Sequence, residues 1–212
     1  MKIGYGSLAR YVWYGFVFFG LVGCVTLSKD ECINANWHSI GYEDAIKGWG
    51  PERMGEHRQA CAKHGVTLEA EDYRLGHREG AREFCRPRNG FQWGLQGQSF
   101  PGFCPDDMEE AFSQAYKQGN EVWGQTRAVR ETEEQIQMLR RDLVNSNDAI
   151  RDTQMRIVSR SGSVVELAQW VLDLRDLAHR QGELEEALRE REKILVKQRH
   201  DLTALKAQYD YR

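Results

Sequence analysis

The sequence has little proline and no strong excess of charge of either sign. It contains 4 prolines in 212 residues, and its 29 Lys and Arg nearly balance its 32 Asp and Glu. Few prolines and no long polar tract exclude a wholly disordered chain, and the balanced charge gives no signal for nucleic-acid partners. The Gly-x-Ser-x-Gly, His-Glu-x-x-His and phosphate-loop motifs of common enzymes are also absent from the sequence. We therefore predict no enzymatic activity and no cofactor.

These scarce residue types are unevenly distributed. No cysteine follows Cys104 and no proline follows Pro105. All but two of the 6 tryptophans (Trp123 and Trp170) precede residue 100. We therefore predict two parts of different character, joined near residues 105–125.

The sequence contains no uncharged apolar run long enough to cross a membrane, which requires roughly 20 residues. The apolar run from Tyr11 to Val22 instead has the length of a signal-peptide core, about 7–15 residues. It ends in Leu21-Val22-Gly23-Cys24, which resembles the bacterial lipobox. The resemblance implies a lipoprotein signal peptide over 1–23, a lipid on Cys24 and a lipidated tether over 24–31. The alternative is a secretory signal cleaved near a chance cysteine.

The residue after Cys24 bears on the membrane that receives the protein. In the enterobacterial pattern an aspartate at this position favours the inner membrane, and here the residue is Val25. We expect a bacterial outer-membrane lipoprotein that faces the periplasm, with the inner membrane and the cell surface as alternatives. Its lipid would make the membrane a partner and leave nucleic acid out of reach.

Four cysteines remain after Cys24, and an even number in an exported chain indicates disulfides. They are Cys32, Cys61, Cys85 and Cys104. Three pairings are open, of which we favour Cys32–Cys61 and Cys85–Cys104. These pairs close loops of about 30 and 20 residues, each worth roughly 3 kcal/mol in the loop-entropy account.

A metal site is the competing interpretation of the same region. His57, Cys61 and His64 would share one face of a helix, and His38 and His77 are close in sequence. Zinc prefers such nitrogen and sulfur ligands, but no Cys-x-x-Cys occurs and a disulfide would consume Cys61. We predict no metal, and expect both His57 and His64 to be partly exposed.

Glycine and aromatic residues recur together between residues 30 and 119. Gly76 and Gly80 would lie on one helical face, where glycine allows close approach of another backbone at a cost of about 1 kcal/mol in helix propensity. We predict short helices over Ser39–Gly48, Glu52–His64 and Ala70–Cys85, packed through glycine. The aromatic residues expected to fill the gaps are Trp37, Tyr73, Phe84, Phe91 and Trp93.

Beyond these helices, Asn89-Gly90 is a turn signal, and Pro105 is expected to begin a long helix at its first position. The region resembles a family of bacterial lipoproteins known as a domain of unknown function, number 2799 in its series. The resemblance spans Cys32 to Gly119 and rests on Cys32, Trp37, Gly41, Cys61, Gly65, Tyr73, Gly76, Gly80, Cys85, Asn89, Gly90, Phe91, Gly94, Gly97, Gly102, Cys104, Phe112, Tyr116 and Gly119. It implies a domain over 32–119 and an envelope location, but no activity.

The C-terminal half repeats apolar residues every seven positions. The first run is Val129, Ile136, Leu143, Ile150 and Ile157, and the second is Leu167, Leu174, Gln181, Leu188, Leu195, Leu202 and Tyr209. The break at Ser159–Ser163 between them predicts an antiparallel coiled-coil hairpin over 120–212, with an intermolecular coiled coil as the alternative. Polar residues on the expected seam would leave room for a partner helix; they are Ser146, Thr153, Arg191 and Gln198.

The fold class is therefore mostly α: a small disulfide-stapled helical domain followed by a long antiparallel coiled-coil helical hairpin. We expect a structural or adaptor protein that contacts protein partners through the coiled coil. The alternative is a protein that binds or modifies peptidoglycan, because paired carboxylates can perform acid–base chemistry on sugars. Candidate carboxylates are Asp44 beside His38 and the group Glu69, Glu71 and Asp72. The latter resemble an ordinary first helical turn, so we predict no catalytic residues.

Overall fold

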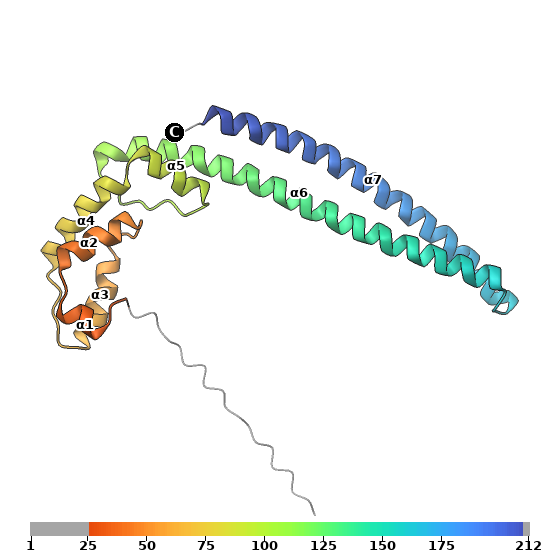
Figure 1. Cartoon of the computed structure of the whole chain (residues 1–212), viewed down its shortest axis with the longest axis horizontal. Coiled ribbons are helices and arrows are strands. Elements are labelled where there is room, and N and C mark those ends of the chain that lie inside the picture. The colour runs from red at the N-terminus through yellow and green to blue at the C-terminus, as the bar shows by residue number, and fades with distance from the viewer. Residues whose placement is uncertain (1–25, 210–212) are drawn as a thin grey trace, which may run out of the picture.

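The protein consists of a helical body that continues into a long two-helix hairpin (Figure 1). The computed structural model describes residues 26–209, so Cys24 and the expected signal peptide lie outside the described residues. Over this range the chain forms seven helices and no strand: α1 (Lys29–Ile33), α2 (Trp37–Ile46), α3 (Arg53–Ala62), α4 (Ala70–Phe84), α5 (Pro87–Leu95), α6 (Asp106–Ser159) and α7 (Val164–Gln208). None of these helices combines the length and apolar character of a membrane span. The predicted fold class is confirmed.

The ends of the short helices follow from local capping. Helices α2, α3 and α4 lie within a turn of the predicted ranges. The additional helix α1 begins at a capping box, in which Ser28 Oγ accepts from the Glu31 backbone amide and the Glu31 carboxylate accepts from the Ser28 amide. Residues 29–31, which the sequence assigns to the tether, are therefore helical.

The turn expected at Asn89-Gly90 is wrong, because α5 runs through both residues. Pro87 stands in the first turn of α5, where proline favours a helix start. A Cβ added at Gly90 would lie closer than 3.0 Å to the Phe112 carbonyl oxygen of α6. This glycine is thus needed for close helix packing rather than for a turn.

Helices α2 and α4 pack through a reciprocal glycine contact. A Cβ at Gly41 would lie closer than 3.0 Å to the carbonyl oxygen of Tyr73, and one at Gly76 would collide with the carbonyl oxygen of His38. Each glycine therefore faces the carbonyl that lies one helical turn before the other glycine. At this distance the two backbones touch directly, a geometry that suits weak Cα–H···O contacts.

Helices α5 and α6 repeat the same contact. Gly94 faces the carbonyl oxygen of Tyr116, and Gly119 faces that of Phe91, again too closely for any Cβ. The body thus contains two helix pairs joined by one device, an aromatic or histidine residue followed three positions later by glycine. The predicted packing through glycine is confirmed.

Aromatic residues fill the space around these contacts. One buried cluster surrounds Cys32 and Cys61, and the other surrounds Cys85 and Cys104. Four of the five aromatic residues predicted to fill the core are buried, and the fifth, Trp93, packs against the second cluster. The body is therefore held by two small cores, each with its own disulfide.

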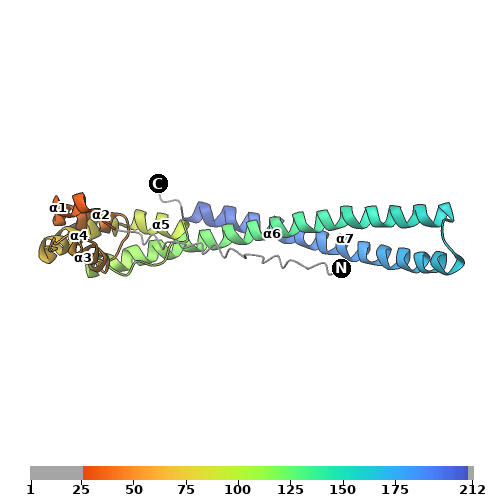
Figure 2. The same cartoon turned by 90° about the horizontal axis from the view of Figure 1, so that it is seen from below.

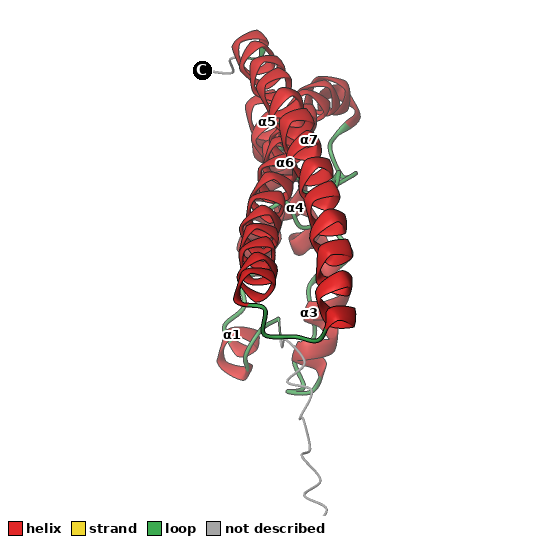
Figure 3. Cartoon of the chain, turned by 90° about the vertical axis from the view of Figure 1, so that its right-hand side faces the viewer, coloured by secondary structure: helices red, strands yellow, loops and turns green. Residues whose placement is uncertain are grey.

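The first helix of the hairpin is continuous with the last helix of the body. Helix α6 begins at Asp106, one residue after Pro105, and continues for 54 residues, so the expected domain limit at 119–120 falls inside it. Helix α7 returns beside it in antiparallel orientation, as Figures 2 and 3 show. Arg140 pairs with Glu192 at 2.8 Å, and the Tyr209 hydroxyl donates to Glu121 at 3.0 Å near the body. The predicted hairpin, with its break after Ser159, is confirmed.

The glycine contacts lead to a paired prediction. Gly41→Ala should lower the free energy of unfolding by about 3 kcal/mol, because the new methyl group meets rigid backbone. Gly124→Ala is the matched control, since a Cβ there has no neighbour within 4 Å. It should stabilise the protein by about 0.5–1 kcal/mol through helix propensity alone. Chemical denaturation measures both, and equal effects of the two substitutions would contradict the packing described.

Candidate functional site

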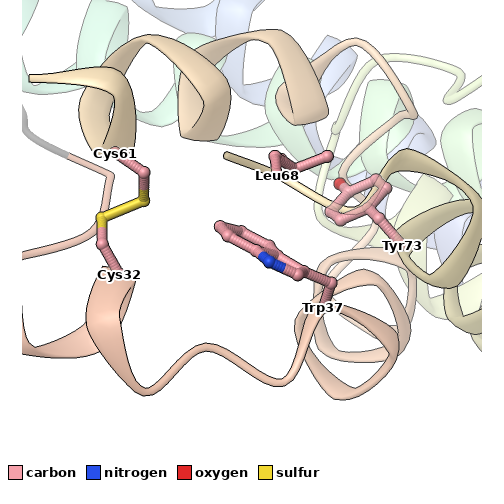
Figure 4. Packing of buried hydrophobic residues seen from close by; sticks show 5 residues of the cluster. All are labelled: Cys32, Trp37, Cys61, Leu68 and Tyr73. Carbon is pink, nitrogen blue, oxygen red and sulfur yellow. A yellow bond between two sulfur atoms is a disulfide. The ribbon is translucent and has the colours of Figure 1, made fainter. Parts of the chain in front are cut away.

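Two disulfides fix the body around its cores. Figure 4 shows the first of them, Cys32–Cys61, in the cluster with Trp37, Leu68 and Tyr73. Cys32 is bonded to Cys61, with 5.3 Å between the Cα atoms, and so ties α1 to α3. Cys85 is bonded to Cys104, with 5.6 Å between the Cα atoms, and so ties the end of α4 to the segment before α6. This is the pairing that the sequence favours. All four cysteines are buried.

The histidines near Cys61 have different surroundings from those expected. His57 is only 2% exposed, so the expectation of partial exposure is wrong for it, whereas His64 is exposed. Cys61 is not available as a ligand because it forms a disulfide. Among residues 26–209, no group of three or more His, Cys, Asp or Glu side chains could hold a metal ion.

A buried polar network connects three helices of the body. The carboxylate of Asp44 on α2 accepts a hydrogen bond from the Tyr73 hydroxyl of α4 and bonds His57 Nε2 of α3, both at 2.7 Å. Arg53 of α3 places its Nε 3.5 Å from the other carboxylate oxygen. A buried carboxylate requires such partners, so Asp44 holds α3 and α4 against α2.

The network positions helices rather than facing a substrate. Asp44 is 4% exposed, and Tyr73 is fully enclosed. Burial, followed by the hydrogen bond to Asp44, raises the pKa of Tyr73 far above its usual value. The expected proximity of Asp44 to His38 is wrong, because His38 lies at the surface and pairs with Glu79 at 3.1 Å. Glu71 pairs with Arg74 on the exposed side of α4.

Sequence reasoning missed this network, although a signal for part of it exists. Trp37, Gly41 and Asp44 are spaced as i, i+4 and i+7, which places Asp44 on the apolar face of its helix. His57 precedes Ala60 and Cys61 by three and four positions and likewise faces inward. Nothing in the spacing, however, indicates that these two faces meet.

The hairpin carries an open groove between α6 and α7. It has a volume of about 1060 Å³, with Ile136 and Leu195 among the residues that line it. Met138 and Val196 also line it and are 49% and 70% exposed. Ion pairs cross the hairpin at Arg140–Glu192 and Arg199–Glu133. Four of the twelve lining residues are apolar and eight are charged or amide side chains, so an amphipathic helix is the kind of partner that this groove could receive.

The seam of the hairpin is incompletely buried. Within the described part of α7, Leu202 is the one buried residue of a 45-residue helix. The leucines predicted on the seam nearer the turn, such as Leu167, Leu174 and Leu188, stay partly exposed. Buried side-chain oxygens of Gln135, Ser146 and Gln198 have no hydrogen-bond partner among residues 26–209. A polar seam was predicted at Ser146 and Gln198.

Comparison with known protein families gives a match over part of the chain. Residues 36–121 match the family model described as "Protein of unknown function (DUF2799)". This segment is therefore similar to DUF2799. The resemblance to family number 2799 predicted from the sequence is confirmed, although the match begins after Cys32; the lipoprotein part of that prediction stays a prediction. The chain matches no curated protein and no solved structure.

The DUF2799 segment coincides with most of the body. It runs from just before α2 into α6 and contains all four glycines of the reciprocal contacts. It also contains Asp44, His57 and Tyr73. The hairpin beyond residue 121 lies outside the match, so the comparison covers the body and not the hairpin.

The buried network gives a prediction on pH. Tyr73 keeps its proton in the folded protein, whereas in the unfolded chain it ionises near its usual pKa of 10.0. The contribution of Tyr73 to the free energy of unfolding should therefore be constant below pH 10. Above pH 10 it should fall as the pH rises. Tyr73→Phe should remove about 1–2 kcal/mol at neutral pH, by loss of a buried hydrogen bond, and should flatten the alkaline decline.

Denaturation curves between neutral pH and pH 11 measure both effects. Tyr42→Phe provides the control, because Tyr42 is only half-buried on α2. A wild-type decline that survives unchanged in Tyr73→Phe would contradict the role assigned to this hydroxyl.

Proposed function

We propose that this protein is an envelope lipoprotein with a structural or adaptor role. A lipid on Cys24 anchors it to the periplasmic face of the outer membrane. The body holds the hairpin, and the hairpin contacts a protein partner through a helix–helix interface. The observation that carries this proposal is the incompletely buried seam between α6 and α7.

The seam supports a partner on physical grounds. Two long helices gain stability mainly from a buried apolar stripe. Here burial on α6 is concentrated in its first part, with Ser146 as the most distal buried residue. Burial of polar atoms such as Ser146 Oγ without hydrogen bonds is also costly. A third helix laid along the seam would cover the half-exposed leucines and offer hydrogen-bond partners to these polar atoms, and the groove at Leu195 is one part of that surface.

The exposed side chains that line the groove indicate the chemistry of this partner. Met138 and Val196 present apolar surface, and methionine adapts to irregular partner surfaces. The ion pairs beside them already balance Arg140 and Arg199 against glutamates of the facing helix. The partner is therefore an amphipathic helix that contributes apolar residues in the centre and polar residues at the rim.

The anchor is supported by the sequence and by the thiol chemistry of the body. The apolar run that ends in Leu21-Val22-Gly23-Cys24 has the form of a lipoprotein signal. Two buried disulfides suit an oxidising compartment. A lipid on Cys24 would lie only a few residues before α1, which would hold the body close to the membrane.

Site-specific photo-crosslinking in growing cells tests the proposal. A photoreactive residue at Met138 should crosslink to a discrete protein in the membrane fraction. Val196→Glu in the same chain should reduce that product at least tenfold, because it places a charge in an apolar interface. In a Cys24→Ser chain the protein should move from the membrane fraction to the soluble fraction.

A photoreactive residue at Lys193 is the matched control. This side chain lies on the same helix as Val196, is exposed, and does not line the groove. Equal crosslinking from both positions would contradict the groove as the interface. A Cys24→Ser chain that stays with the membrane would contradict the lipid anchor.

A further inference from the structure

The end of the hairpin exposes apolar side chains to an unusual degree. We call residues 155–166 the hairpin tip. Val158, Val164 and Val165 are 82%, 83% and 79% exposed, and Met155 is 61% exposed. Valine is also a weaker helix former than arginine, lysine, glutamine or glutamate. Neither local helix stability nor packing within the chain accounts for three exposed valines at this point.

The connection at the tip is closed by contacts within the chain. The Ser163 side chain caps α7, and the Glu166 carboxylate accepts from the Ser163 amide at 2.7 Å. The ring of Trp170 lies so close to Gly162 that a Cβ there would approach it to 2.7 Å. The connection between the helices is thus closed by a cap and an aromatic ring, and the valines at the start of α7 point outward.

The charges of the tip are predominantly positive. Arg156 and Arg160 have no ion-pair partner among the described residues, whereas Arg151 pairs with Asp148 behind the tip. The one acidic residue of the tip is Glu166, and its hydrogen bonds to Ser163 direct it into the cap. Two guanidinium groups without an ion-pair partner among the described residues therefore lie within a few sequence positions of the exposed valines.

The backbone at Arg160 adds an independent observation. This residue ends α6 in the left-handed conformation, with φ of 50°. Glycine or asparagine usually takes this position, and another residue there costs roughly 1–2 kcal/mol. An arginine occupies this strained position although its side chain has no ion-pair partner in the described part of the chain. Strain of this kind points to a contact outside the chain.

We infer that the hairpin tip docks onto an anionic phospholipid surface. Arg156 and Arg160 would bind lipid phosphates, and Val158, Val164 and Val165 would enter the boundary between headgroups and acyl chains. A bilayer interface accepts apolar side chains that are flanked by cations, and anionic lipids attract such cations. The inference goes beyond the proposed function and does not rest on the partner helix or on the lipid at Cys24.

The position of the tip suits a lipid surface better than a protein pocket. The tip is the end of the molecule farthest from the body (Figures 1 and 2). The groove is lined by residues 130–141 and 192–199 of the hairpin, so it is separate from the tip. A projecting end that combines valines with unpaired arginines complements a soft, negatively charged surface.

Environment-sensitive fluorescence at the tip tests this inference in the full chain. In a Cys24→Ser chain, the four native cysteines that remain all form disulfides. Val164→Cys then adds the single free thiol for labelling. In vesicles of phosphatidylglycerol and phosphatidylcholine with brominated acyl chains, the label should be quenched. A label at Val196→Cys, which replaces an exposed valine in the middle of α7, should not be quenched. This comparison isolates the tip from any binding by the N-terminal apolar run.

Two variants then separate the contributions. Arg156→Gln with Arg160→Gln should lower the ratio of inserted to free tip about 25-fold, since each arginine near an anionic surface contributes roughly fivefold. Val158→Ser with Val165→Ser should lower it about tenfold. Vesicles of phosphatidylcholine alone should leave the label unquenched. Equal quenching of the labels at Val164→Cys and Val196→Cys would overturn the inference. So would quenching at the tip that is unchanged when both arginines are replaced. Absence of quenching in the anionic vesicles, with a label that instead changes its fluorescence on addition of envelope proteins, would show that the tip binds a protein and would also overturn it.

Discussion

A direct contact between helix backbones, made possible by glycine, is the constraint on which the body depends. Gly41 and Gly76 join α2 to α4, and Gly94 and Gly119 join α5 to α6, each against a carbonyl oxygen of the facing helix. Because no side chain can stand at these points, the geometry of each pair is fixed by the backbones themselves. Helix α6 carries Gly119 and then continues to the end of the hairpin. The contact that closes the body therefore also determines the direction in which the arm projects.

The remaining attachments of the body are of two kinds. Helix α3 is held by the disulfide between Cys32 and Cys61 and by the Asp44 carboxylate, which binds His57 of α3 and Tyr73 of α4. Such a small body buries limited apolar surface, and the disulfides together with the hydrogen bonds to Asp44 offset that shortage. The result is a rigid platform at one end of the chain and a thinly packed arm at the other.

Local patterns predicted much of this architecture, and contacts between distant segments account for what they missed. The seven-residue spacing of apolar residues and the break after Ser159 are local, and the hairpin follows from them. The spacing of Gly76 and Gly80 predicted close packing but could not name α2 as the facing helix. Asn89-Gly90 has the form of a turn, yet the approach of α6 to Gly90 keeps it helical. The meeting of Asp44 and His57 depends on how two helices cross, which no spacing in the sequence records.

The central claim is that the arm is stable near the body and lacks a complete core of its own farther out. Hydrogen exchange along α6 in the purified protein measures this most directly. Amides from residue 110 to Ile136, which cover the buried part of α6, should exchange at least 100-fold more slowly than those beyond Leu143, because local opening requires less free energy where little surface is buried. Equally slow exchange along the whole helix to Ser159 would contradict the account, since it would show a hairpin that needs no partner.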